Sequence, residues 1–165
     1  MKDCLPGNFS RSFMPSALRV AVVIATKGRP QAVSRLLGLL ERQTMRPATV
    51  VLSAADRSDL ETTLDTQLSV QCIFGEAGLT KQRNRGLERV QEACDLVVFF
   101  DDDFAPAANW LELCAEIFHT EPEVVGVTGA VLRDGAHSDQ LSWNEAERVL
   151  EEARPAVSAQ QKLIE

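Results

Sequence analysis

Three consecutive aspartates, Asp101, Asp102 and Asp103, come directly after the strongly apolar stretch Leu96–Phe100. If the backbone stays extended, Asp101 and Asp103 point to the same side, because side chains alternate along a strand. Carboxylates about 6 Å apart repel each other by a few kcal/mol at an effective dielectric constant of about 20. Their oxygens are hard ligands that suit Mg²⁺ or Mn²⁺. The triplet therefore predicts a divalent-metal site with Asp101 and Asp103 as ligands. The alternative is a solvated acidic turn in which an aspartate caps a helix.

Basic residues occur at two further places where chemistry is possible. Lys81, Arg83 and Arg85 follow a glycine-containing stretch at a predicted helix start. Backbone N–H groups there favour anions, and arginine offers a two-pronged donor for phosphate. Residues two apart on a helix do not share a face, so we choose Arg83 first and Lys81 second as ligand contacts. Arg29, in the turn after the first predicted strand, is a candidate of the same kind. For all of these the alternative is an ordinary solvated surface charge.

The elements that must position these residues alternate along the chain. Apolar and β-branched runs predict five strands, at residues 19–26, 49–53, 70–74, 96–100 and 124–132. Apolar residues at helical spacing predict helices between them: after Pro30, from the Ser58/Glu61 capping-box pattern through Leu60, Leu64 and Leu68, after Thr80, after Pro106 and over 144–153.

This alternation predicts an α/β fold: an open, mainly parallel, Rossmann-like sheet with helices on both faces. In such sheets ligands bind outside the carboxyl ends of the strands. The basic residues and the aspartate triplet should therefore converge on one edge of the sheet. That edge would suit an anionic phosphate group bridged to a cation.

Composition limits the classes of protein that need to be considered. The chain has 165 residues, the size of one domain, with 45% hydrophobic and 25% charged residues, as in soluble globular proteins. A net charge of -7 argues against a general nucleic-acid binder. The four cysteines form no CxxC pair and no zinc-finger pattern. Cys94 and Cys114 fall on apolar helix faces, which indicates reduced, buried thiols and fits a reducing compartment. Without a signal peptide or a membrane-spanning run, we expect a cytoplasmic protein.

Four segments, in order, resemble family-2 glycosyltransferases of the GT-A fold: VAVVIATKGRP, GLTKQRNRGL, VVFFDDDFAPAANWLE and VVGVTGAV. The resemblance implies transfer of a sugar from a nucleotide-diphosphate sugar to a hydroxyl of a sugar, lipid or polysaccharide acceptor, with Mg²⁺ or Mn²⁺ as cofactor. By the same resemblance, Asp101 and Asp103 would hold the metal. The expected donor contacts are Thr26 at the nucleoside, Arg83 near the base or phosphates, and additionally Arg29, Asp56, Lys81 and Asp102.

Two departures from the family pattern shape the expected domain organisation. The family usually has an acidic pair at the end of its second strand, where this chain reads Ser53-Ala54-Ala55-Asp56, so that Asp56 is the remaining candidate. The family's general base lies in an acceptor-binding half, expected here beyond Glu165. We therefore expect a loose leader over 1–18, an incomplete nucleotide-sugar-binding domain over 19–153 and a tail over 154–165. The isolated chain should be weakly active or inactive, and membrane association would have to come from a longer parent protein.

Two other functions are compatible with this pattern. A nucleotidyltransferase also combines an α/β sheet with acidic metal ligands, but normally has a glycine-rich phosphate loop where this chain reads TKGRP. A non-catalytic sugar-nucleotide-binding module would need the donor site and no general base.

Overall fold

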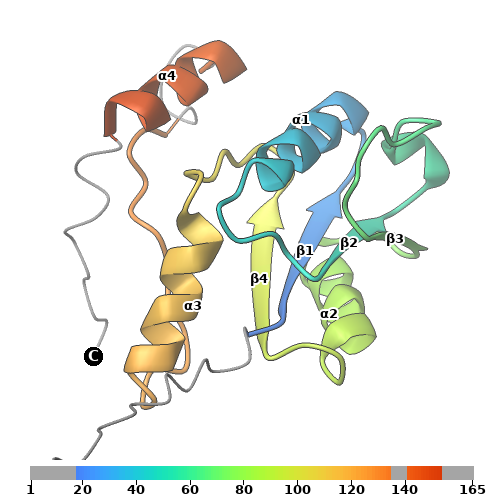
Figure 1. The fold of residues 1–165 in the computed structure, drawn as a ribbon. Helices are drawn as coiled ribbons and strands as arrows, with labels where there is room; N and C mark the ends of the chain where they lie inside the picture. The colour runs from blue at the N-terminus through green and yellow to red at the C-terminus, as the bar shows by residue number, and fades with distance from the viewer. Residues whose placement is uncertain (1–17, 135–140, 154–165) are drawn as a thin grey trace, which may run out of the picture.

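The structure is a computed structural model that describes residues 18–134 and 141–153. Along the chain its elements are β1 (Val20–Thr26), α1 (Pro30–Glu41), β2 (Thr49–Ala54), the short 3₁₀ helix η1 (Arg57–Asp59), β3 (Val70–Phe74), α2 (Leu79–Val90), β4 (Leu96–Asp101), α3 (Trp110–Thr120) and α4 (Trp143–Ala153). Figure 1 shows the sheet with α1, α2 and α3 beside it and α4 farther out.

All four strands are parallel, in the order β3-β2-β1-β4. The central strand β1 is buried along its whole length, and its Val22 pairs with Val50 of β2 and Val98 of β4. Such a strand reads as a continuous apolar run because helices cover both of its faces. The predicted α/β class and the parallel sheet are confirmed, and all four strands finish at the same edge.

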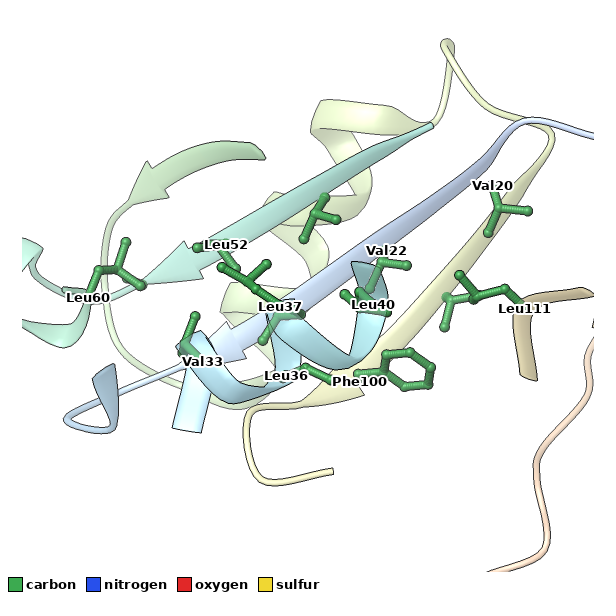
Figure 2. Packing of buried hydrophobic residues seen from close by; sticks show 14 residues of the cluster. Val20, Val22, Val33, Leu36, Leu37, Leu40, Leu52, Leu60, Phe100 and Leu111 are labelled. Atoms are coloured by element: carbon green, nitrogen blue, oxygen red, sulfur yellow. The ribbon is translucent and has the colours of Figure 1, made fainter. Parts of the chain in front are cut away.

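Alternate residues of β1 enter two different cores. Val20, Val22 and Ile24 belong to the larger core, which contains the inner face of α1 and Leu111 of α3. Figure 2 shows Val33, Leu36, Leu37 and Leu40 of α1 packed over the strands. Ala21 and Val23 face the other way and meet Val90 of α2. Helices therefore lie on both faces of the sheet, as predicted.

The fifth strand predicted over 124–132 is wrong, since this segment has no regular secondary structure. Val125 is 97% exposed and Val131 is 70% exposed. A β-branched run becomes a strand only when a neighbour satisfies its backbone N–H and C=O groups. Within the described residues no strand of the sheet pairs with this segment, and Gly126 and Gly129 further weaken an isolated extended conformation.

The helix predicted after Ser58 is also wrong, because only the 3₁₀ turn η1 forms there. The capping box is made by Asp56 and Asp59 instead of Ser58 and Glu61. Leu60, Leu64 and Leu68 nevertheless contact the larger core from irregular backbone. Their four-residue spacing correctly indicated that these side chains are buried, but a loop folded back on the core buries them here instead of a helix.

Of the two thiols expected to be buried, Cys114 is buried and Cys94 is partly buried. Cys72, Cys94 and Cys114 are free thiols, of which Cys114 is buried and Cys72 is exposed. None of the helices in the described part is long and apolar enough to cross a membrane. Cys4, residues 1–17 of the leader predicted over 1–18, and the tail predicted over 154–165 lie outside the described residues.

Candidate functional site

A cleft of about 620 Å³ opens at the carboxyl edge of the sheet. It lies where β1 and β4 end and where α2 begins, the position at which open parallel sheets bind their ligands. Its lining residues are Ala25, Thr26, Lys27, Arg29, Ala77, Gly78, Leu79, Gln82 and the three aspartates Asp101–Asp103.

All three aspartates of the triplet line this cleft, but they differ in how far their side chains are exposed. β4 ends at Asp101, and the chain then turns, with the N–H of Phe104 donating to the carbonyl of Asp101 at 3.1 Å. The extended backbone assumed from the sequence therefore stops at Asp101. Asp102 is only 6% exposed, whereas the side chains of Asp101 and Asp103 are 55% and 61% exposed. The two predicted metal ligands both line the cleft, with a buried carboxylate between them.

Each carboxylate of the triplet has a partner from another element. The hydroxyl of Thr26 donates to Asp102 at 2.7 Å. The guanidinium of Arg29 donates to Asp102 at 3.0 Å and to Asp103 at 2.6 Å. Arg83 donates to Asp101 at 2.6 Å. The negative charge of Asp102, followed by that of Asp103, raises the pKa of Arg29, which keeps this guanidinium charged.

The residues present suit a hydrated divalent ion better than a fully protein-bound one. Among the residues described, no group of three or more His, Cys, Asp or Glu side chains is arranged to hold a metal. Mg²⁺ typically takes one or two carboxylates and completes its shell with water and substrate phosphates. Asp101 and Asp103 offer such a pair, and the arginines beside them already show that these oxygens attract cations.

Three predicted donor contacts do not line the cleft: Arg83 bonds Asp101, which does line it, whereas Asp56 and Lys81 have partners elsewhere. Asp56 caps η1 by accepting from the backbone N–H and the hydroxyl of Ser58 at 2.9 and 2.8 Å, and these bonds lower its pKa. Lys81 forms an ion pair with Glu76 on the surface. Neither residue lines the cleft, so a role for either in donor binding stays a prediction.

The family model for "Glycosyl transferase family 2" matches residues 21–163. The chain belongs to this family. Among solved structures the chain is similar to S. aureus TarS, with 18% sequence identity and a TM-score of 0.45. That similarity covers 71% of this chain and 24% of the TarS chain. A search of curated proteins finds no match.

In this family-2 domain, the buried carboxylate of Asp59 was missed by the sequence analysis. It accepts from the backbone N–H of Gly28 at 2.7 Å, of Ala55 at 2.9 Å and of Asp56 at 2.8 Å. Asp59 thereby joins the β1–α1 turn, which carries Arg29, to the end of β2. Gly28 has a φ of 69°, a conformation that other residues rarely adopt. The capping pattern predicted from the sequence was Ser58 with Glu61, and no local pattern indicates that a turn 31 residues away is the partner of Asp59.

Gln82 is the second residue of the candidate site that sequence reasoning did not single out. It is 4% exposed, and its amide donates to the carbonyls of Thr26 and Ser53, both at 2.7 Å. Its side-chain oxygen accepts from the N–H of Gly78, the N-cap of α2, at 3.1 Å. One side chain thus holds the ends of β1 and β2 and the start of α2 together at the back of the cleft. Nothing in the sequence distinguishes Gln82 from a surface glutamine except its spacing of four residues from Gly86.

Proposed function

We propose that this domain binds a nucleoside-diphosphate sugar together with Mg²⁺ or Mn²⁺, for glycosyl transfer to a hydroxyl of a sugar, lipid or polysaccharide acceptor. The observation that carries the proposal is the meeting of the aspartate triplet, Arg29 and the start of α2 around one cleft. Membership of glycosyl transferase family 2 supports the reaction class.

The residues at the cleft have two proposed roles: some would bind the donor, and others hold the donor-binding residues in place. Asp101 and Asp103 would hold the metal, which when bound stabilises the departing diphosphate. Arg29 in the cleft, and Arg83 through its place beside Asp101, would supply positive charge for the phosphates, and the backbone N–H groups at the start of α2 would add to it. Asp102 is buried, and its bonds to Thr26 and Arg29 fix the turn on which its two neighbours lie.

Binding of donor nucleotides is the direct test. Titration of UDP, GDP and dTDP sugars by calorimetry, with and without Mn²⁺, should give binding for at least one of them that depends on the metal. The variants Asp101→Asn and Asp103→Asn should each weaken this binding by about tenfold or more, since each removes a charged ligand.

Asp95→Asn is the matched control, because Asp95 lies before the other end of β4 and pairs with Arg19 at 3.2 Å. It removes the same charge and the same kind of arginine partner without touching the cleft, so donor affinity should stay at the wild-type value. Equal losses in all three variants, or binding that ignores the metal, would contradict the proposed site.

A donor-binding module without turnover is the second candidate. Among the described residues, the carboxylates that line the cleft are those of the triplet, and each already accepts a hydrogen bond from an arginine. A general base needs a carboxylate or imidazole free to accept the proton of the acceptor hydroxyl. Metal-dependent donor binding without donor hydrolysis or transfer by this chain would favour the second candidate.

A further inference from the structure

The loop from Gly75 to Gly78 joins β3 to α2 and has no regular secondary structure. Its last two residues, Ala77 and Gly78, line the cleft together with Leu79, the first residue of α2. Irregular backbone gives a binding site a defined shape only when packing and hydrogen bonds hold it. Gln82 accepts from the N–H of Gly78 and so holds the end of the loop, whereas a different residue of α2 holds its beginning.

Arg85 reaches the beginning of this loop from the second turn of α2. Its Nη2 atom donates to the carbonyl of Ala54, the last residue of β2, at 3.2 Å, and its Nη1 atom donates to the carbonyl of Glu76 at 3.4 Å. The N–H of Gly75 donates to the same carbonyl of Ala54 at 3.2 Å. One guanidinium therefore connects α2 to the end of β2 and to the start of the loop.

Gly75 has the small size that this contact requires. A Cβ atom at Gly75 would lie 2.5 Å from Nη1 and 3.0 Å from Cζ of Arg85, so the guanidinium occupies the space of a side chain there. The φ of Gly75 is not positive, so its backbone conformation alone would allow other residues. The guanidinium of Arg85 is thus the physical reason for a glycine at this position.

The contact is expected to matter more for position than for global stability. The Nε atom of Arg85 is buried and has no hydrogen-bond partner among the described residues. A buried N–H without an acceptor costs free energy, which offsets part of the gain from the two bonds to carbonyls. Loss of Arg85 should therefore shift the loop while the domain stays folded.

We propose that Arg85 is a positioning residue for nucleotide binding, which holds the loop 75–78 against the end of β2 so that Ala77, Gly78 and Leu79 form a fixed wall of the cleft. This inference rests on the proposed function and adds to it a residue that does not itself line the cleft. Arg85 acts through the loop and not by contact with the ligand. Neither of its bonds goes to the aspartate triplet, so metal binding should not depend on it.

The test measures the affinity for UDP, GDP and dTDP by calorimetry with Mn²⁺ present, and the affinity for Mn²⁺ alone by electron paramagnetic resonance, on the full chain. The variants are Arg85→Ala, Gly75→Ala and the double variant, each with its melting temperature. Gly75→Ala keeps every charge, but its methyl group displaces the flexible end of Arg85 from the two carbonyls. Arg89→Ala is the matched control, because Arg89 is an exposed arginine of the same helix, four residues farther along.

Arg85→Ala and Gly75→Ala should each weaken nucleotide binding about three- to tenfold, the size expected for the loss of one or two hydrogen bonds. The double variant should match either single variant within about twofold, because both changes break the same contact. Affinity for Mn²⁺ alone should stay at the wild-type value in all variants, and Arg89→Ala should keep the wild-type affinity for nucleotide. If Arg85→Ala does not fold, Arg85→Lys takes its place, since lysine keeps the charge but lacks the planar fork that bonds both carbonyls.

Two results would overturn the role of Arg85 and leave the proposed function intact. One is wild-type nucleotide affinity in Arg85→Ala, and the other is a double variant whose loss is the product of the two single losses, because the two residues would then act independently. Weaker binding of Mn²⁺ alone, in step with nucleotide, would also contradict this role, since a general loss of structure would explain both. Wild-type protein that binds none of the three nucleotides with Mn²⁺ would contradict the proposed function, and the role of Arg85 with it.

Discussion

At the scale of single residues, burial separates carboxylates that hold the turns around the cleft from carboxylates that are exposed in it. Asp59 and Asp102 are each 6% exposed. Asp59 accepts a hydrogen bond from Gly28, and Asp102 accepts hydrogen bonds from Thr26 and Arg29. Buried carboxylates remain stable only when such donors satisfy them. The exposed Asp101 and Asp103 have weaker constraints, and this leaves them available for a ligand.

Asp59→Ala should lower the free energy of unfolding by about 3 kcal/mol, at the upper end of the ~1–3 kcal/mol expected when buried donors lose their acceptor. The reason is that the N–H groups of Gly28, Ala55 and Asp56 all lose the same carboxylate. Urea denaturation followed by circular dichroism gives the value.

Asp56→Ala is the control for this change, since Asp56 belongs to the same turn but is exposed. Asp56→Ala should lower the free energy of unfolding by clearly less than Asp59→Ala does. The effect of Asp56→Ala should also fade in acid. The hydrogen bonds from Ser58 lower the pKa of Asp56 in the folded protein. Its contribution to stability is therefore present above the pKa of the unfolded state, about 3.9, and is lost as the pH falls through the pKa of the folded state. Equal losses for both variants at pH 7 would contradict the role assigned to Asp59.

At the scale of elements, the close packing of α2 on β1 fixes the start of α2 at the cleft. Buried Gln82, Gly86 and Val90 form the inner face of α2, at spacings of four residues. A Cβ atom at Gly86 would lie 2.2 Å from a methyl carbon of Val23. The missing side chain therefore sets the distance between helix and sheet, and with it the position of Gln82.

Gly86→Ala should destabilise the protein by about 1–3 kcal/mol, because the added methyl group has no room. Gly38→Ala, the matched change in α1, should instead stabilise it by roughly 0.5–1 kcal/mol, because nothing lies within 4 Å of a Cβ there and alanine favours the helix. Thermal unfolding of both variants checks the two signs. Stabilisation by both would show that α2 is not packed against Val23 in this way.

At the scale of the whole molecule, one sheet edge collects residues from distant parts of the chain. The strand order β3-β2-β1-β4 sets the end of β4 beside the end of β1, although Arg29 and Asp102 are 73 residues apart. The larger core under α1 and α3 includes Leu111, which is completely buried, and Cys114 on the same helix is 7% exposed.

Cys114 should report on the integrity of this arrangement. Burial raises the pKa of its thiol to about 12, so at pH 8 it stays protonated and shielded from reagents. Iodoacetamide should modify exposed Cys72 in the native protein and reach Cys114 only after denaturation, as peptide mass spectrometry would detect. Native-state modification of Cys114 at the rate of Cys72 would contradict the packing of α3 on the sheet.

The sequence alone determined the features that depend on neighbours along the chain. The four apolar runs that became β1–β4, the helix starts after Pro30 and near Thr80, and the aspartate triplet at a strand end were all predictable from local patterns. Parallel strands followed from their alternation with helices, and this brought Thr26, Arg29, Arg83 and the triplet to one edge.

Tertiary structure decided what depends on contacts between distant segments. It selected Asp59 instead of Asp56 as the carboxylate that holds the Gly28 turn, and it buried Asp102 while leaving Asp101 and Asp103 exposed. In the part of the chain that the structure describes, residues 124–132 join no strand of the sheet. Apolar spacing reports that a residue is buried, but the partner of each buried or charged group is set by strand order and register, which no local pattern contains.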